Sequence, residues 1–258
     1  INMPAGWQKK RSSNGEYYAK LIVDDRNVPE VGQTKSYSYT FDVELYGMKA
    51  SGSMNKKYIA TLNSGNRQYL GNDHPYIDKN NATIRSISNT LWSQSKNNPL
   101  IYAKKAYEYV GSNYRYLNAY TGLHPVSTIL RNNGGDCGNL SSLFISLMQA
   151  RNIPARHLVA VSPRQNYHAW AEFYLDKVGW VPVDVTYKNK NRNGDYFGNY
   201  NISTAHIVLH KRLNMSVIDI NGRNFISPIL QSYLWWVDGS GGTISLLTPT
   251  FKVTSQRL

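Results

Sequence analysis

The stretch GGDCGNLSSLFISLMQ, residues 134–149, contains the only cysteine of the chain, Cys137. Its apolar residues recur at positions 140, 143, 144, 147 and 148, a spacing that places them on one face of an α-helix. Two glycines allow a tight turn before this helix, and Asp136 is a suitable N-cap residue. The sequence therefore predicts that Cys137 lies in the first helical turn, where backbone N–H groups and the helix dipole favour a thiolate.

The composition describes a globular chain that can bury a large core. It has 258 residues, of which 41% are hydrophobic and 17% are charged. No run of about 18 apolar residues occurs, so we expect no transmembrane segment. A single cysteine excludes an internal disulfide framework and any zinc site built from several cysteines.

The chain is strongly basic, with 29 Lys and Arg against 16 Asp and Glu and a net charge of +13. Such a surface attracts anionic partners, including nucleic acid, acidic glycans and an anionic cell envelope. The basic residues are scattered, with short runs at 9–11 and 188–192 and no nucleic-acid motif, so no specific nucleic-acid partner is expected. The start at Ile1 suggests a removed export signal, and together with the charge it favours an extracytoplasmic location: periplasmic, secreted or envelope-associated.

Three regions differ in their sequence pattern. We expect residues 1–72 to form a β-rich N-terminal segment, 73–202 a core that contains Cys137, and 203–258 a β-rich extension packed on that core. In the two flanking regions the expected strands cover 17–23, 37–45, 207–209, 215–220, 233–236 and 244–247.

Within the core, helical and extended patterns follow each other. Helical spacing covers 83–95, Asn98-Pro99 starts a second helix that Gly111 should stop, and His124-Pro125 opens a short third one. After Pro154 the period changes from 3.6 to 2, which predicts strands at 156–161, 167–175 and 180–185. A helix followed by an antiparallel hairpin is an α+β arrangement in which the Cys137 helix packs on a sheet.

Cys137 needs a base and an orienting group if it is a nucleophile. His168 begins the first strand of the predicted hairpin, and Asp184 ends the second. Because the outer ends of paired strands lie side by side, the carboxylate can fix the tautomer and orientation of the imidazole. Pro182 interrupts the hydrogen-bonding ladder, which predicts a bulge or an edge position.

Four segments together resemble a known family: GDCG at 135–138, QARNIPAR at 149–156, HAWAE at 168–172 and GWVPVD at 179–184. They are similar to the transglutaminase-like core, a branch of the papain-like cysteine-enzyme superfamily that includes bacterial cysteine protease-like proteins. The resemblance implies a helix packed on an antiparallel sheet, with Cys137 as nucleophile, His168 as base and Asp184 as orienting carboxylate.

The chain also departs from the family pattern. Asn139 stands where the family often has an acidic residue, and Val185-Thr186 stands where it often has Pro-Thr. No residue is a clear counterpart for an additional oxyanion side chain. Tyr116, Tyr120 and Trp170 are the candidates, and each is also typical of a core position.

Two functions remain open at this point. The first is a cysteine-dependent acyl-transfer enzyme that acts on amide bonds of a peptide or protein, with a cell-envelope peptide as one option, by hydrolysis or amine transfer. The second is a non-catalytic module that binds a peptide or glycan on the same scaffold. Peptide:N-glycanase and arylamine N-acetyltransferase patterns fit less well, since zinc-binding Cys-x-x-Cys pairs are absent and the HAWAE strand suits the latter poorly.

No cofactor is expected for either function. His206 and His210 have i, i+4 spacing, but the intervening Ile-Val-Leu favours a strand, so we expect no metal site there. The oligomeric state stays open.

Overall fold

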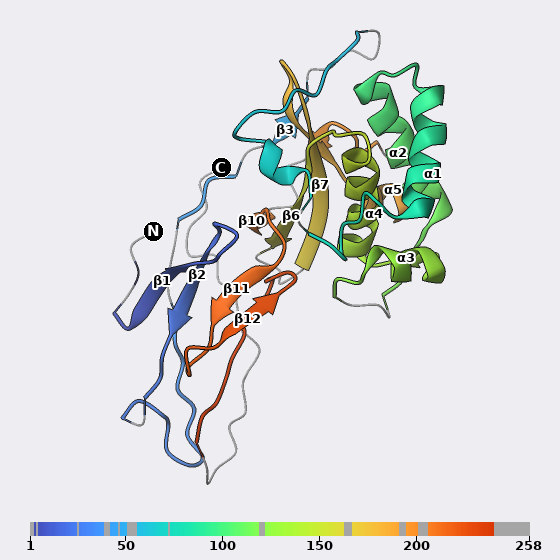
Figure 1. Cartoon of the computed structure of the whole chain (residues 1–258). Helices are drawn as coiled ribbons and strands as arrows, with labels where there is room; N and C mark the ends of the chain where they lie inside the picture. The colour runs from blue at the N-terminus through green and yellow to red at the C-terminus, as the bar shows by residue number, and fades with distance from the viewer. Residues whose placement is uncertain are drawn as a thin grey trace.

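The structure is a computed structural model with the α+β fold that the sequence predicts (Figure 1). Helices lie on one side of a four-stranded antiparallel sheet, and α4, Cys137–Gln149, contacts β6 and β7 on one side and the other helices on the other. The described residues are 3, 5–24, 26–38, 42–45, 47–50, 56–71, 73–118, 122–162, 167–190, 195–200 and 206–239.

Asparagine side chains cap the first two helices, and the second starts at Asn98-Pro99 as the sequence predicts. In α1, Ala82–Gln94, the Asn81 side chain accepts hydrogen bonds from two first-turn N–H groups. In α2, Pro99–Asn113, Asn98 accepts from the Leu100 N–H, and Pro99 occupies the first position. The short α3 spans Val126–Asn132. Among the described residues, no helix combines the length and hydropathy needed to cross a bilayer.

Gly111 does not stop α2, contrary to the prediction, because the helix continues to Asn113. A Cβ atom at Gly111 would lie 2.6 Å from Cγ of Lys188, on α5 (Val185–Lys190). The glycine therefore permits a close approach of two helices. From the sequence alone, a glycine needed for helix–helix packing looks the same as a glycine that ends a helix.

The central sheet has the order β10-β6-β7-β8. Pro182 pairs with Glu172 in a regular register on the edge strand β8, so its position is an edge and not a bulge. The strands are β6 (Ala155–Val161), β7 (Tyr167–Leu175), β8 (Gly179–Val183) and β10 (Ile207–His210).

A helix replaces the predicted end of the third strand. We expected strand through Val185, but β8 ends at Val183 and α5 begins at Val185. Oδ1 of Asp184 accepts a hydrogen bond from the Tyr187 N–H at 3.0 Å, which caps this short helix. The alternation of apolar residues, from which the strand was predicted, carries no information about this cap.

Apolar side chains fill both faces of the sheet. The larger cluster lies between the helices and one face, where Tyr102, Tyr107, Phe144 and Phe173 are fully buried. Because side chains alternate along a strand, Trp170 faces the other way and packs with a smaller cluster on the opposite face.

Short strands extend the architecture around this core. Within the described residues they form four antiparallel or parallel pairs, and a 3₁₀ turn, η1, spans Arg67–Tyr69. The pairs are β1 (Trp7–Arg11) with β2 (Tyr17–Leu21), β3 (Met48–Lys49) with β9 (Asn199–Tyr200), β4 (Arg115–Tyr116) with β5 (Gly134–Gly135), and β11 (Met215–Ile218) with β12 (Asn224–Ser227).

Hairpins from opposite ends of the chain lie side by side, β1–β2 next to β11–β12 (Figure 1). The Ser216 N–H donates to Oγ of Ser12 at 2.8 Å, and the Lys211 N–H donates to Oε1 of Glu16 at 2.9 Å. These contacts join segments about two hundred residues apart in sequence, and they are mostly between side chains and backbone.

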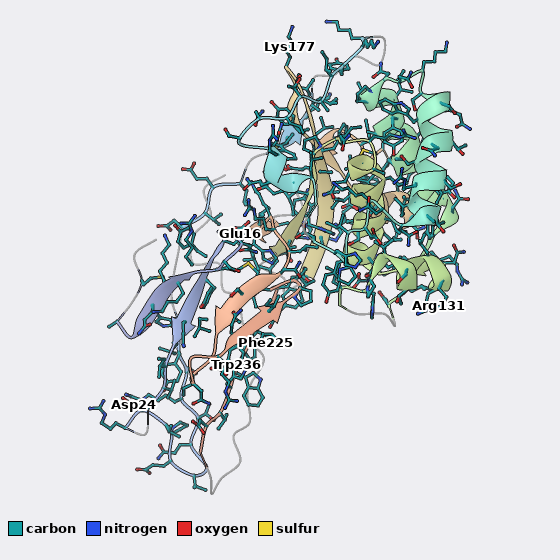
Figure 2. The ribbon with its side chains drawn as sticks, viewed as in Figure 1. Glu16, Asp24, Arg131, Lys177, Phe225 and Trp236 are labelled. Carbon is teal, nitrogen blue, oxygen red and sulfur yellow. The ribbon has the colours of Figure 1, made fainter. Side chains whose placement is uncertain are left out.

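Two predicted strands are wrong in the parts that the structure describes. Residues 37, 38, 42–45 and 233–236 have no strand structure, whereas 39–41 and 244–247 lie outside the described residues. Alternating aromatic and β-branched residues suit a pleated surface, but they form a strand only when another strand pairs with them. Instead, Trp236 makes an edge contact with Phe225 of β12, their ring centroids 5.8 Å apart (Figure 2).

Candidate active site

Cys137 is half-buried at the start of α4, as the sequence predicts. The side chain of Asp136 caps the helix by accepting a hydrogen bond from the Asn139 N–H at 3.0 Å. The preceding glycines are needed for close packing. A Cβ atom at Gly134 would lie 2.2 Å from the Arg115 carbonyl oxygen, and one at Gly135 would lie 2.5 Å from Cβ of Asn139.

Asn139 links the helix start to the loop that precedes α3. Its fully buried amide donates to the Gly122 carbonyl at 2.9 Å and to Oδ1 of Asp136 at 2.7 Å, and its oxygen accepts from the His124 N–H at 2.8 Å. An acidic side chain could not donate to the Asp136 carboxylate when ionised. Asn139, which stands where the family often has an acidic residue, therefore suits the hydrogen-bond partners around it.

His168 and Asp184 meet at the end of the β7–β8 hairpin. Nε2 of His168 lies 2.6 Å from Oδ2 of Asp184, and both residues are at most 9% exposed. The second carboxylate oxygen is bound to the Tyr187 N–H, and the Asp184 N–H donates to the Tyr196 carbonyl at 3.0 Å. The carboxylate is thus fixed by the start of α5 as well as by the histidine.

The thiol of Cys137 completes this arrangement. Burial alone would lower the pKa of His168, but the charge of Asp184, its hydrogen bond, and the hydrogen bond and charge of Cys137 raise that pKa to about 10. Because Asp184 occupies Nε2, the remaining ring nitrogen, Nδ1, is left for the thiol. The structure therefore brings the three predicted residues together around one protonated imidazole.

Three aromatic rings surround the His168 ring. Trp170 stacks at 5.8 Å between ring centroids, Tyr187 lies at 5.1 Å and His206 at 5.2 Å. Sequence reasoning missed Tyr187 and His206 as neighbours of this residue. No spacing rule could have found His206, because it is brought there by the pairing of β10 with β6, strands about fifty residues apart.

His206 and His210 have different neighbours. His206 contacts His168, whereas Nδ1 of His210 donates to the Arg212 carbonyl at 2.8 Å and Nε2 accepts from the Leu230 N–H at 3.0 Å. Across the described parts of the chain, no three His, Cys, Asp or Glu side chains are grouped so that they could hold a metal ion.

Tyr116 is the oxyanion candidate that the structure places near the thiol. It pairs with Gly135 across β4 and β5, two residues before Cys137. Burial, and then the negative charges of Cys137 and Asp136, raise the pKa of the Tyr116 phenol. Trp170 is buried in the smaller cluster against His168, and Tyr120 lies outside the described residues.

The site thus combines a thiol at a helix start with an imidazole and a carboxylate at the end of a hairpin, the arrangement that the sequence resemblance implies. Comparison with known families gives the same answer, since residues 86–185 match the model of the Transglutaminase-like superfamily. The resemblance stated from the sequence is thus confirmed for this segment. None of the curated proteins matches the chain.

Part of the chain is similar to parts of several solved structures. A candidate cysteine protease from Cytophaga hutchinsonii is 16% identical, with a TM-score of 0.45, over 58% of this chain and 47% of that one. The periplasmic domain of TgpA from Pseudomonas aeruginosa, bound to ethylmercury, is 20% identical, with a TM-score of 0.39, over 50% and 51%. A candidate protease from Parabacteroides distasonis is 10% identical, with a TM-score of 0.37, over 66% and 32%. The matched region spans about half the length of the first two of these proteins.

Proposed function

We propose that this protein is a cysteine-dependent acyl-transfer enzyme that acts on amide bonds of a peptide or peptide-like substrate. The observation that carries the proposal is the buried His168–Asp184 pair, 2.6 Å apart, which leaves the other imidazole nitrogen for Cys137. A thiolate held beside an imidazolium is the nucleophilic form of cysteine, and the carboxylate orients the imidazolium.

The chemistry would proceed in two halves. Sγ of Cys137 attacks the carbonyl carbon, and the π electrons of the C=O bond move to oxygen. When the C=O bond re-forms, the C–N bond breaks, and His168 gives its proton to the departing amine, which leaves a thioester on Cys137. Water or a second amine then attacks the thioester carbon while His168 accepts its proton. When the C=O bond re-forms, the C–S bond breaks, which releases the acid or amide product and restores the thiolate.

Two groups are available to stabilise the oxyanion. The Cys137 N–H belongs to the first turn of α4, where N–H groups have no partner within the helix. The Tyr116 hydroxyl, close enough to be influenced by the thiolate charge, is the second donor in this proposal. We expect Tyr116→Phe to reduce the acylation rate by about tenfold. A reduction of less than about twofold would show that the Cys137 N–H stabilises the oxyanion without Tyr116.

A test of the central step uses a p-nitrophenyl ester of a short peptide as the acyl probe. The wild-type chain should gain one acyl group, seen in its intact mass, and should release p-nitrophenol much faster than a free cysteine peptide does. Cys137→Ala should gain none. If the wild type reacts no faster than the free peptide, the acyl-transfer proposal fails and the scaffold is a binding module.

Hydrolysis and amine transfer are separated by adding an amine to the acylated enzyme. The ratio of free acid to amide product gives the partition of the thioester between water and amine. A triad alone does not fix this ratio, because it depends on which nucleophile reaches the thioester.

The proposal includes a location outside the cytoplasm and a substrate of the cell envelope. The net charge of +13 supports it, since an anionic envelope attracts a basic protein. Immunodetection in fractionated source cells provides the test, and a purely cytoplasmic signal would contradict this part of the proposal.

A further inference from the structure

The aromatic rings around His168 come from different parts of the chain. Trp170 lies on the same strand, β7, and Tyr187 lies on α5, directly after Asp184. His206 precedes β10 and lies beyond the segment 86–185 that matches the superfamily model. The catalytic imidazole of the proposed site is therefore in contact with a side chain from the C-terminal part of the chain.

His206 is a buried polar side chain without a full set of partners. It is 7% exposed, its ring centroid lies 5.2 Å from that of His168 and 5.9 Å from that of Trp170, and its Nδ1 is buried without a hydrogen-bond partner among the described residues. Burying a polar nitrogen in this way costs free energy, which an apolar ring of the same size would avoid.

The charge state of His206 fits its position beside an imidazolium. Burial and the positive charge of His168 lower the pKa of His206 to about 4, while Asp184, the other charged group facing it, acts in the opposite direction. At neutral pH the His168 ring is thus a cation and the His206 ring is neutral. A second proton would place two like charges within 5.2 Å between ring centroids.

A second residue from the C-terminal part holds the backbone of His168. Nε2 of Gln231 donates to the His168 carbonyl at 3.1 Å and to the Ala160 carbonyl at 3.4 Å. The neighbouring Leu230 N–H is bound to Nε2 of His210 on β10. The segment after β12 is thereby attached to both β10 and the start of β7.

We propose that the C-terminal segment completes the site: His206 positions the His168 ring and keeps water from it, and Gln231 positions the His168 backbone. This inference rests on the function proposed above. Excluding water strengthens the interactions of His168 with Asp184 and Cys137, because charges attract more strongly in a medium of lower dielectric constant. Both residues act through His168 and make no contact with the reacting carbonyl.

The first experiment compares His206→Ala with His206→Phe. In the alanine variant water reaches His168, which both relieves its burial and weakens its attraction to Asp184 and Cys137. The NMR titration of the imidazole should therefore differ from that of the wild type. Alkylation of Cys137 by iodoacetamide at neutral pH should slow about tenfold. The phenylalanine variant keeps a ring at this position. Its His168 titration should therefore match that of the wild type, and its alkylation rate should return to within about twofold.

The second experiment removes the donors of Gln231 without disturbing His206. Gln231→Ala should slow alkylation of Cys137 about threefold to tenfold. The matched control is Gln68→Ala, which removes a side-chain amide bound to the Gly65 carbonyl on an exposed surface and should leave the rate unchanged. If His206→Ala does not fold, this comparison still decides whether the C-terminal segment positions His168 through Gln231, and His206→Phe is compared directly with the wild type.

The outcomes separate this inference from the proposed function. If the acyl probe labels the wild type but neither His206→Ala nor Gln231→Ala changes the His168 titration or the alkylation rate, the positioning role is overturned and the enzyme remains. If the probe fails but the His168 titration still differs in His206→Ala, the positioning role stands on a site without acyl-transfer activity.

Discussion

The central core and the paired terminal hairpins are held together by different forces. In α4, every residue after Cys137 is buried, and the helix packs between the sheet and the other helices. In β1, the residues after Trp7 are exposed, and hydrogen bonds such as Ser216 N–H to Ser12 Oγ join the two hairpins. Dense apolar packing fixes side chains in place, whereas each hydrogen bond contributes only about 1 kcal/mol net. The comparison explains why the candidate site lies in the core.

The largest effect should come from Asp184→Asn. The amide oxygen can still cap α5, so the fold should persist, but the negative charge that holds the His168 imidazolium is lost. We expect acylation by the probe to slow by roughly a hundredfold to ten-thousandfold. The control is Asp195→Asn, which breaks an exposed ion pair with Lys104 and should leave the rate unchanged. A rate within about threefold of the wild type for Asp184→Asn would contradict a triad.

The next prediction sets one phenylalanine of the core against one of the hairpins. Phe144→Ala removes a fully buried ring of α4 and should lower the free energy of unfolding by about 3–5 kcal/mol. Phe225→Ala removes a 45% exposed ring of β12 and should cost about 1 kcal/mol or less. Urea unfolding of the two variants provides the measurement, and equal losses would show that the two regions do not differ as described.

A third prediction concerns the pH dependence of stability. His157 is 1% exposed, and its Nε2 lies 3.1 Å from the Gly138 carbonyl; burial lowers its pKa to about 4. The unfolded chain binds this proton near pH 6.5 and the folded chain does not, so stability should fall as the pH drops from about 6.5 towards 4. The loss at pH 5 should be on the order of 2 kcal/mol from this residue.

His168 has the opposite effect. Because its folded pKa is raised, its contribution is complete below about pH 6.5 and is lost as the pH rises towards 10. Thermal unfolding measured across this range should therefore give a maximum near neutral pH. In His157→Gln, which keeps a donor towards Gly138, the loss on the acid side should become smaller, and an unchanged acid side would contradict the assignment.

A further prediction concerns the contact between the two hairpins. Ser12→Ala removes the acceptor of the buried Ser216 N–H and should destabilise the contact between the two hairpins by about 1–2 kcal/mol. Hydrogen exchange of the β11 amides should accelerate, while the acylation rate stays the same. The control, Ser93→Ala, removes a hydroxyl of α1 bound to the Thr90 carbonyl on an exposed surface. A large loss of acylation in Ser12→Ala would show that the hairpins also shape the site.

Local signals were sufficient for the principal elements of the site. Capping by Asp136 placed Cys137 at the helix start, and the change of period placed His168 and Asp184 at the hairpin ends. The role of Gly111, the α5 helix and the approach of His206 depend on contacts between distant segments, which periodicity does not encode. Residues 37, 38, 42–45 and 233–236 do not form the expected strands for the same reason, since a strand requires a partner.

The most direct test of the central claim is the titration of His168 in the wild-type protein, followed by NMR of its imidazole and assigned with His168→Phe. The account predicts an imidazolium that persists through about pH 8 and titrates near 10, because Asp184 and Cys137 both stabilise its charge. A midpoint near its usual 6.5, unchanged in Asp184→Asn, would contradict the account.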